Sequence, residues 1–158
     1  MRQSEAGELS RIRRSTPSNK ASANNFRGIS MLNLSQEIYD RNIQSTRLAL
    51  KDAILSINIW DREMGLTLAE WQGNPTAVAL ITQLVNELDQ VLKAGGLEKP
   101  EDYPYLDLAD NTALVILDHG DNLMQGWLIN TDKANLGILL GMAVPTALSN
   151  IKSAKSSN

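Results

Sequence analysis

The spacing of apolar residues divides the sequence into eight segments of two kinds. Five have the alternation or the short apolar runs typical of strands, at residues 53–60, 66–71, 103–108, 113–117 and 123–130. Gly65 lies in the turn between the first two, which predicts a β-hairpin. Polar turns at Asp110-Asn111 and residues 119–122 separate the other three, which predicts a three-stranded meander. Pro104 lacks a backbone donor, so we expect its strand at a sheet edge.

Three longer segments have helical spacing. The first covers residues 34–51, where the apolar positions are only partly periodic. The second covers residues 75–94. Its boundaries are well marked, because Asn74 suits an N-cap, Pro75 suits the first turn and Gly95-Gly96 ends a helix.

The third helix is expected to begin at Thr131 or Asp132 and to run close to the C-terminus. Pro145 removes a backbone hydrogen bond to Gly141, which predicts a kink there. We expect its inward side to carry Leu136, Leu139, Leu140, Ala143, Ala147, Leu148 and Ile151, with Gly137 and Gly141 allowing close approach to the sheet.

The order of elements is therefore α-β-β-α-β-β-β-α. Hairpin connections make the five strands one antiparallel sheet, and three helices are available for its two faces. This predicts an α/β (α+β) fold with three layers, α/β/α.

The helix at residues 75–94 is apolar over too much of its circumference for one sheet face. One stripe contains Val78, Ile81, Val85, Leu88 and Leu92, and a second contains Ala77, Leu80, Leu84 and Val91. A helix that only covers a sheet needs one such stripe. A second subunit is the natural partner for the other stripe.

Composition limits the possible chemistry. The 158 residues suit one domain and a tail, with 15 Lys and Arg against 18 Asp and Glu. Residues 1–30 carry six basic and two acidic side chains, so their charge is +4 and the remaining chain has −7. We interpret residues 1–30 as a disordered basic tail and residues 31–155 as the domain. The acidic domain disfavours nucleic-acid binding.

Metal, cofactor and membrane sites have little support in the sequence. There is no cysteine and a single histidine, so thiolate and multi-histidine metal sites are excluded within one chain. We expect no cofactor. The apolar run at residues 136–144 is much shorter than the ~20 residues of a membrane span, and no signal-peptide core is present. The sequence favours a cytoplasmic protein without stable membrane association.

No catalytic constellation emerges, so we expect a protein that is not an enzyme. His119 lies beside Asp118 and Asp121 in a turn that we expect to be exposed, and no activated serine accompanies it. A hydrolase built on His119 is the weakest hypothesis. The oxygen-rich turn lacks a complete calcium-loop spacing.

Several side chains are candidate partner contacts. Arg62 lies in the first hairpin turn, where we expect it to pair with Asp61 or Glu63, and Arg13 and Arg14 lie in the tail. Two tryptophans on neighbouring strands, at positions 60 and 71, could pair across the hairpin.

Three segments resemble the Roadblock/dynein-light-chain family, which has a profilin-like α/β/α fold. They are the strand, acidic turn, glycine and strand of residues 57–71, the apolar helix of residues 75–94, and the sequence NTDKANLG at residues 130–137. The resemblance covers residues 34–152 approximately. It implies a non-catalytic dimerising domain that binds small Ras-like GTPases or acts as a scaffold in larger complexes, including motor complexes.

Applied to this chain, the resemblance implies a homodimer formed by the central helix and the strand that follows it. The implied interface contains Ala77, Leu80, Leu84, Val91, Tyr103, Tyr105 and Asp107. The alternative is a ligand-sensing α/β/α domain with a small-molecule pocket between sheet and helix.

Overall fold

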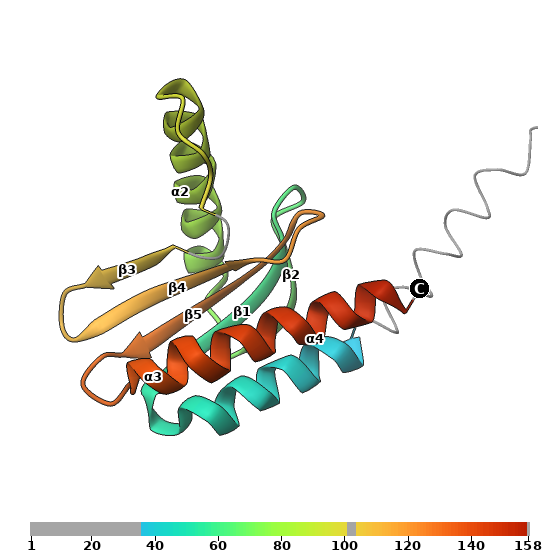
Figure 1. The fold of residues 1–158 in the computed structure, drawn as a ribbon, viewed down its shortest axis with the longest axis vertical. Coiled ribbons are helices and arrows are strands. Elements are labelled where there is room, and N and C mark those ends of the chain that lie inside the picture. Colours follow the sequence, from blue (N-terminus) through green and yellow to red (C-terminus); the bar gives the residue numbers. More distant parts are fainter. Residues whose placement is uncertain (1–35, 101–103, 158) are drawn as a thin grey trace, which may run out of the picture.

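The computed structural model describes residues 36–100 and 104–157, and it has the expected element order (Figure 1). The first helix covers residues 36–50 and is followed by a 3-10 turn, Lys51–Ala53. The other elements are β1 Ile54–Asp61, β2 Leu66–Trp71, α2 Pro75–Ala94, β3 Tyr105–Leu108, β4 Thr112–Asp118, β5 Leu123–Asn130, α3 Leu136–Ile138, a π-helical turn Leu139–Ala143, and α4 Val144–Ser156. The basic tail lies outside the described residues.

The five strands form one antiparallel sheet in the order β2-β1-β5-β4-β3. β5 therefore lies at the centre, and β2 and β3 form the two edges. The expectation that the strand after the central helix lies at an edge is confirmed. Pro104 lies directly before β3, at the start of an edge strand, where a residue without a backbone donor is tolerated.

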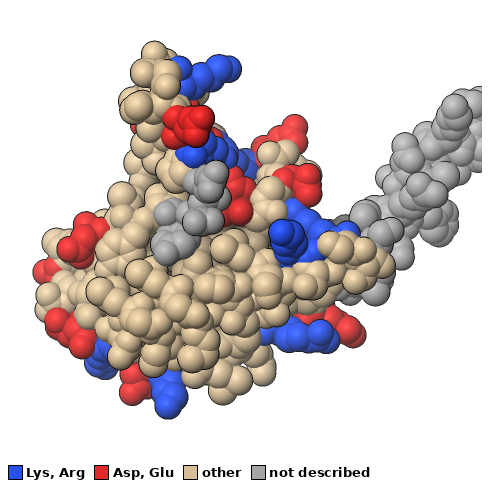
Figure 2. Space-filling view, in the orientation of Figure 1, with Lys and Arg blue, Asp and Glu red and all other residues tan. Residues whose placement is uncertain are grey.

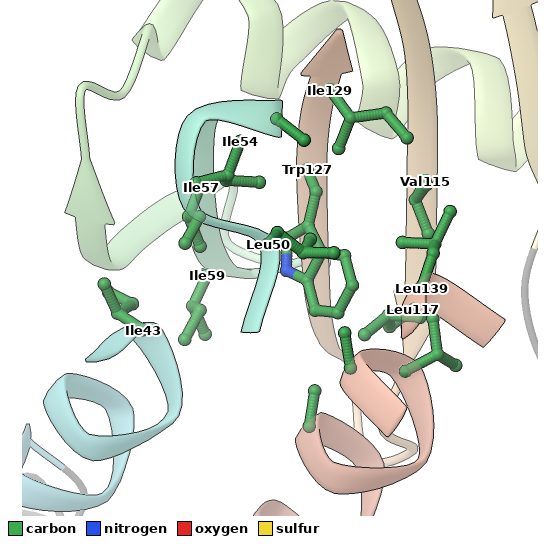
Figure 3. Packing of buried hydrophobic residues seen from close by; sticks show 14 of the residues in the cluster. Ile43, Leu50, Ile54, Ile57, Ile59, Val115, Leu117, Trp127, Ile129 and Leu139 are labelled. Carbon is green, nitrogen blue, oxygen red and sulfur yellow. The ribbon is translucent and has the colours of Figure 1, made fainter. Parts of the chain in front are cut away.

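The larger core lies between the sheet and the layer formed by the first helix and α4 (Figures 1 and 3). Trp127 of β5 is fully buried at its centre, with Leu50 of the first helix and Leu139 beside the ring. Strand alternation explains this face, since Ile57, Ile59, Val115, Leu117, Trp127 and Ile129 all point to it.

A second, smaller cluster lies on the other face of the sheet, under α2. It contains Trp60, Val78, Val85, Ile116 and Met124, with Ile81 and Leu114 packed against it. Among the described residues, α2 is the helix that covers this face, and its C-terminal turns extend away from the sheet (Figure 1). The three-layer arrangement is thus confirmed, with very unequal layers.

The two hairpin tryptophans do not pair, contrary to expectation. Trp60 lies in the cluster under α2, whereas Trp71 pairs in register with Ile57 and packs on the opposite face. The Arg47 guanidinium lies 4.4 Å from the centre of the Trp71 ring. A register irregularity between Ile59 and Trp60 accompanies this arrangement.

The last helix begins later than predicted. Asn130 closes a turn by accepting the backbone N–H groups of Asp132 and Lys133, and Asn135 is the true N-cap of α3. The irregularity expected from Pro145 is present as a π-helical turn, which covers Leu139–Ala143 and ends directly before Val144 and Pro145.

This π-helical turn also changes which side of the helix faces the sheet. Leu139, Ala143, Ala147 and Ile151 are buried as predicted, but Leu136 and Leu140 are exposed. Gly137 and Gly141 are exposed too, so they do not bring the helix close to the sheet. The wider turn does not follow the α-helical spacing from which the inward side was counted, and the buried side is narrower than that count.

Candidate interaction site

The most exposed apolar surface of α2 is the second stripe identified in the sequence. Leu80 is 63% exposed, Leu84 44% and Val91 67%, and Ala77 is partly buried. Of the twenty residues of α2, only Val78 and Val85 are buried. The inner stripe therefore makes the apolar contacts between α2 and its own sheet, and the outer stripe has no cover within the described residues.

Local chemistry at both ends gives α2 its length independently of packing. Asn74 accepts hydrogen bonds from the N–H groups of Thr76 and Ala77 through its side-chain oxygen. At the other end Gly96 has φ +67°, and the Leu97 N–H donates to the Leu92 carbonyl. The helix is thus fixed as a unit of twenty residues that its own sheet covers poorly.

The open edge of the sheet at β3 is the second part of the site. Tyr105 is 38% exposed and Leu108 45%, and Asp107 is exposed as well. β3 pairs with β4 on one side, and no strand of the described residues pairs with its outer row of backbone groups. Tyr103 lies outside the described residues.

A chain of charged groups holds α2 above the sheet. Arg62, in the turn between β1 and β2, donates to the Asn86 Oδ1 at 2.7 Å and to the Asp89 Oδ2 at 2.6 Å. Lys99, in the segment after α2, lies 2.6 Å from Asp118 of β4 and 3.7 Å from Asp89. The expected pairing of Arg62 with its neighbours Asp61 or Glu63 is not what forms.

The Asp118 carboxylate is held in its charged form. Burial by itself raises the pKa of Asp118, but hydrogen bonds from Lys99 and the Gly120 N–H, with the charges of Lys99 and Arg62, outweigh it and lower the pKa. Since the Arg62 guanidinium is engaged by two side chains of α2, it fixes the helix. It is not free to act as an arginine finger.

His119 is half-buried instead of exposed, contrary to expectation. Its Nε2 lies 2.9 Å from the Gln125 Oε1, and the buried Gln125 amide donates to Asn42 of the first helix. The Asn42 amide donates in turn to the Ala147 carbonyl of α4 at 2.9 Å. This network joins the sheet to the first helix and to α4, which is a structural role.

The same environment disfavours protonation of His119. Burial lowers its pKa, and the Lys155 charge lowers it further, while the hydrogen bond with Gln125 and the Asp118 charge raise it. The net pKa lies below the ordinary value. Among residues 36–100 and 104–157, no group of three His, Asp or Glu side chains is placed to hold a metal ion.

Among the described residues, the hollow next to α2 gives little room for a small molecule. A hollow between α2 and the sheet, lined by Val85, Pro104, Ile116 and others, holds about 20 Å³, close to the size of one water. Two open hollows of about 420 and 470 Å³ lie near the end of the first helix, one beside Arg47 and Trp71 and the other beside Ile138.

A further exposed apolar surface lies at the start of the last helix. Its side chains are Leu136 (58% exposed), Leu140 (43%) and Met142 (52%). Figure 2 shows that this side of the molecule is largely uncharged over α3 and α4, with charged side chains at its periphery. By length and composition alone, the continuous helix Leu136–Ser156 is apolar enough to cross a membrane, with 28% of the tested window buried. Its buried side packs on the sheet.

The structure places the residues of the expected dimer interface on α2 and β3, and it places the candidate partner contact Arg62 elsewhere. Leu80, Leu84 and Val91 form one exposed side of α2, while Arg62 lies under the helix. Leu106 was not singled out in the sequence. Counting strand register back from Leu114, which packs under α2, would have placed Leu106 and Leu108 on the α2 face. Arg13 and Arg14 lie outside the described residues.

No family model matches the sequence, and no curated protein matches it. Solved structures with a similar fold include "MglB with tetrameric arrangement" (16% identity, covering 74% of this chain and 92% of that one, TM-score 0.56). The gliding protein MglB from Thermus thermophilus is 14% identical, with coverage of 77% and 93% and a TM-score of 0.59. Myxococcus xanthus MglB is 11% identical, with coverage of 80% and 90% and a TM-score of 0.62.

A Roadblock/LC7 domain from Streptomyces avermitilis is also similar, at 15% identity, coverage of 64% and 84%, and a TM-score of 0.49. At these identities the likeness concerns the fold. The fold is the Roadblock/LC7 type that the sequence resemblance predicts, with a five-stranded antiparallel sheet between helices.

Proposed function

We propose that this protein is a non-enzymatic homodimer that regulates a small Ras-like GTPase or acts as a scaffold in a larger assembly. The observation that carries the dimer is α2, a capped helix of twenty residues with two buried side chains. A helix with Leu80, Leu84 and Val91 facing water gains stability when a second apolar surface covers it.

The sheet edge extends this surface. Leu106 and Leu108 lie on the same face of the sheet as α2, because Leu106 pairs in register with Leu114, which packs under α2. A partner that covers the outer side of α2 can therefore also contact β3. A two-fold symmetric pair satisfies both surfaces at once, since each subunit offers the other the same patch.

The GTPase part of the proposal rests on the sequence resemblance and on the fold shared with MglB structures, one of which is described as tetrameric. The site chemistry agrees with a binding role. The Arg62 guanidinium is occupied by α2, and His119 is part of a structural network. The ligand-sensing alternative needs a pocket between sheet and helix. The hollow under α2 holds about 20 Å³, and the two larger hollows, of about 420 and 470 Å³ near the end of the first helix, are open to solvent.

Sedimentation velocity of the full chain at micromolar concentration tests the dimer. We expect a particle of twice the chain mass of 17.4 kDa. A monomer at every concentration up to about 100 μM, the weak end of specific affinities, would remove the dimer from the proposal.

Binding to purified small Ras-like GTPases tests the regulatory role. Each GTPase is loaded with GDP or with a non-hydrolysable GTP analogue, and the rates of GTP hydrolysis and nucleotide release are measured with and without this protein. Faster hydrolysis indicates an activator, faster release an exchange factor, and binding alone a scaffold. If no small Ras-like GTPase from the source cell binds in either nucleotide state, the proposed regulation of a GTPase is wrong, even if the protein is a dimer.

The basic tail is a proposed contact with the same partner. In the full chain, Arg13→Glu combined with Arg14→Glu reverses two charges in residues 1–30 and leaves the sequence of residues 31–155 unchanged. Weaker GTPase binding with an unchanged dimer supports this role, and unchanged binding contradicts it. Localisation in the cytoplasm stays a prediction from the sequence.

A further inference from the structure

The outer side of the continuous last helix, Leu136–Ser156, is uncharged over most of its length. Between Lys133 and Lys152 the sequence has no charged residue. The exposed side chains at its start include four large apolar residues, which we call the α3 patch: Leu136, Ile138, Leu140 and Met142. Residues four apart on a helix are neighbours, so these side chains form two adjoining pairs. Such a dense apolar patch gains stability when it is covered.

A hollow adjoins the α3 patch. It holds about 470 Å³ between the end of the first helix and the start of α3, and Leu50, Ala53 and Ile138 are among its lining residues. Ile138 belongs both to the hollow and to the patch. A segment that lies on the patch can therefore place one of its side chains in the hollow.

The first helix runs beside α4 in the opposite direction (Figure 1). Its last residue, Leu50, lines the same hollow as Ile138, and the Asn42 amide in its middle donates to the Ala147 carbonyl of α4. Residue 36, where the first helix begins, therefore lies toward the C-terminal end of α4. The α3 patch lies at the other end of this helix pair.

The sequence directly before residue 36 has the composition to cover an apolar surface. Residues 26–34 have a single charged residue, Arg27, whereas five of their nine side chains are large and apolar: Phe26, Ile29, Met31, Leu32 and Leu34. Residues 2–25 contain only two large apolar side chains, Leu9 and Ile12. A nearly uncharged segment and an uncharged surface lose little polar hydration when they meet.

The length of this segment matches the distance that it has to cover. The first helix, residues 36–50, is roughly 22 Å long at a rise of about 1.5 Å per residue. Nine residues in extended form reach up to about 30 Å. Residues 26–34 are therefore long enough to run back from the start of the first helix to the α3 patch.

We propose that residues 26–34 fold back along the last helix of their own chain and cover the α3 patch. Ile29 and Met31 then lie on the patch, and Phe26 reaches the hollow beside it. This inference goes beyond the proposed dimer and the proposed GTPase binding, and it depends on neither. The larger core, on which the last helix packs, and the cluster under α2 lie on opposite faces of the sheet.

This fold-back determines where most of the basic tail leaves the domain. Residues 1–25 then leave beside the start of α3, at the opposite end of the first helix from residue 36. Arg13 and Arg14 are presented at that end of the molecule. A partner that competes for the α3 patch displaces residues 26–34 and moves both arginines at the same time.

Thiol accessibility tests whether residues 26–34 cover the patch, because the chain has no cysteine of its own. Full-length Leu140→Cys is treated with N-ethylmaleimide, alone and combined with Ile29→Ser, Met31→Ser and Leu32→Ser. We expect the serine substitutions to speed the reaction by roughly tenfold or more, as for a segment that is closed about nine-tenths of the time. Met64→Cys, at a position that is 69% exposed in the turn between β1 and β2, should react at the same rate with and without them.

An unchanged rate for the Leu140→Cys thiol overturns the proposal in either of two ways. A fast reaction in both chains shows that the patch is open in the full chain. A slow reaction in both chains shows that something other than residues 26–34 covers the patch, such as a second copy. Circular dichroism of each variant controls for folding.

A pair of cysteines distinguishes the segment's own chain from a second copy. Under mild oxidation, Ile29→Cys with Leu136→Cys should form a disulfide within one chain, at least about tenfold faster than the matched pair Ile29→Cys with Met64→Cys. Equal rates show that the segment has no fixed place. A disulfide that forms only between chains shows that it covers a second copy. Both results overturn the proposal, and both can be read whether the protein sediments as a monomer or as a dimer.

Discussion

A carboxylate at position 84 tests whether the outer side of α2 lies between subunits. Leu84 is 44% exposed in the single chain, in the middle of the exposed stripe. If the stripe is an interface, Leu84→Asp places one unpaired charge in each of two symmetric copies. If Leu84 is only a surface residue, the substitution changes little.

The expected magnitude follows from the exposed fraction. Full burial of a leucine side chain stabilises by roughly 1.5–3 kcal/mol, so covering the exposed part of Leu84 contributes about 1 kcal/mol per subunit. Both subunits lose this, about 2 kcal/mol per dimer. Leaving a buried charge without a partner costs a further 1–3 kcal/mol or more at each site, approximately. The sum, at least about 4 kcal/mol, weakens the dimer by roughly a thousandfold.

The assay is light scattering after size exclusion, from about 1 to 100 μM, with urea unfolding followed by circular dichroism. We expect a folded monomer at all of these concentrations. The free energy of unfolding of the monomer should change by no more than about 0.5 kcal/mol, as for other exposed positions. Leu136→Asp is the matched control, since Leu136 is 58% exposed in the first turn of α3, away from α2. That variant should remain dimeric.

Two results would refute the reasoning. A variant that unfolds even when monomeric places Leu84 in the core of its own chain. A folded variant that dimerises as tightly as the original protein shows that the outer side of α2 is not the contact.

Three further predictions concern the single chain. Because burial lowers the pKa of His119 in the folded state, the unfolded chain binds the proton first as pH falls below 6.5. The free energy of unfolding should therefore decrease as the pH falls from 6.5 toward the folded-state pKa of His119. Urea titrations of His119→Asn should not show this decrease. Asn74→Ala should cost about 1 kcal/mol in thermal or urea unfolding, since two N–H groups of α2 lose their cap. Gly126→Ala should destabilise by roughly 1–3 kcal/mol, because the new methyl would lie 3.2 Å from the buried Trp60 ring; unchanged melting would show that the ring can move.

Local chemistry in the sequence was enough to predict the elements and their order. Asn74-Pro75 and Gly95-Gly96 define α2 because capping depends on neighbouring residues, and the structure has the same bounds. The turn at Asp110-Asn111 has both residues at positive φ, as the residue types favour. The same reasoning identified the excess apolar surface of α2, because a stripe's width can be counted from helical periodicity.

Which side of the last helix faces the sheet could not be predicted in this way. Leu136 and Leu140 have the spacing of an inward stripe, yet both are exposed, and the helix between them and Val144 has a π-helical turn. A proline at position 145 indicates that the helix is irregular. It does not indicate whether a kink or a wider turn relieves the clash.

Partners across the fold were decided only by the tertiary structure. Arg62 bonds to Asp89 of α2 instead of its neighbours in sequence, and His119 is held by Gln125, whose own partner Asn42 is 83 residues away. Such pairs depend on which strands are adjacent, in which register, and on which face a helix lies. Periodicity and turn chemistry act over a few residues, so they determine the elements, whereas the packing of layers determines which side chains meet.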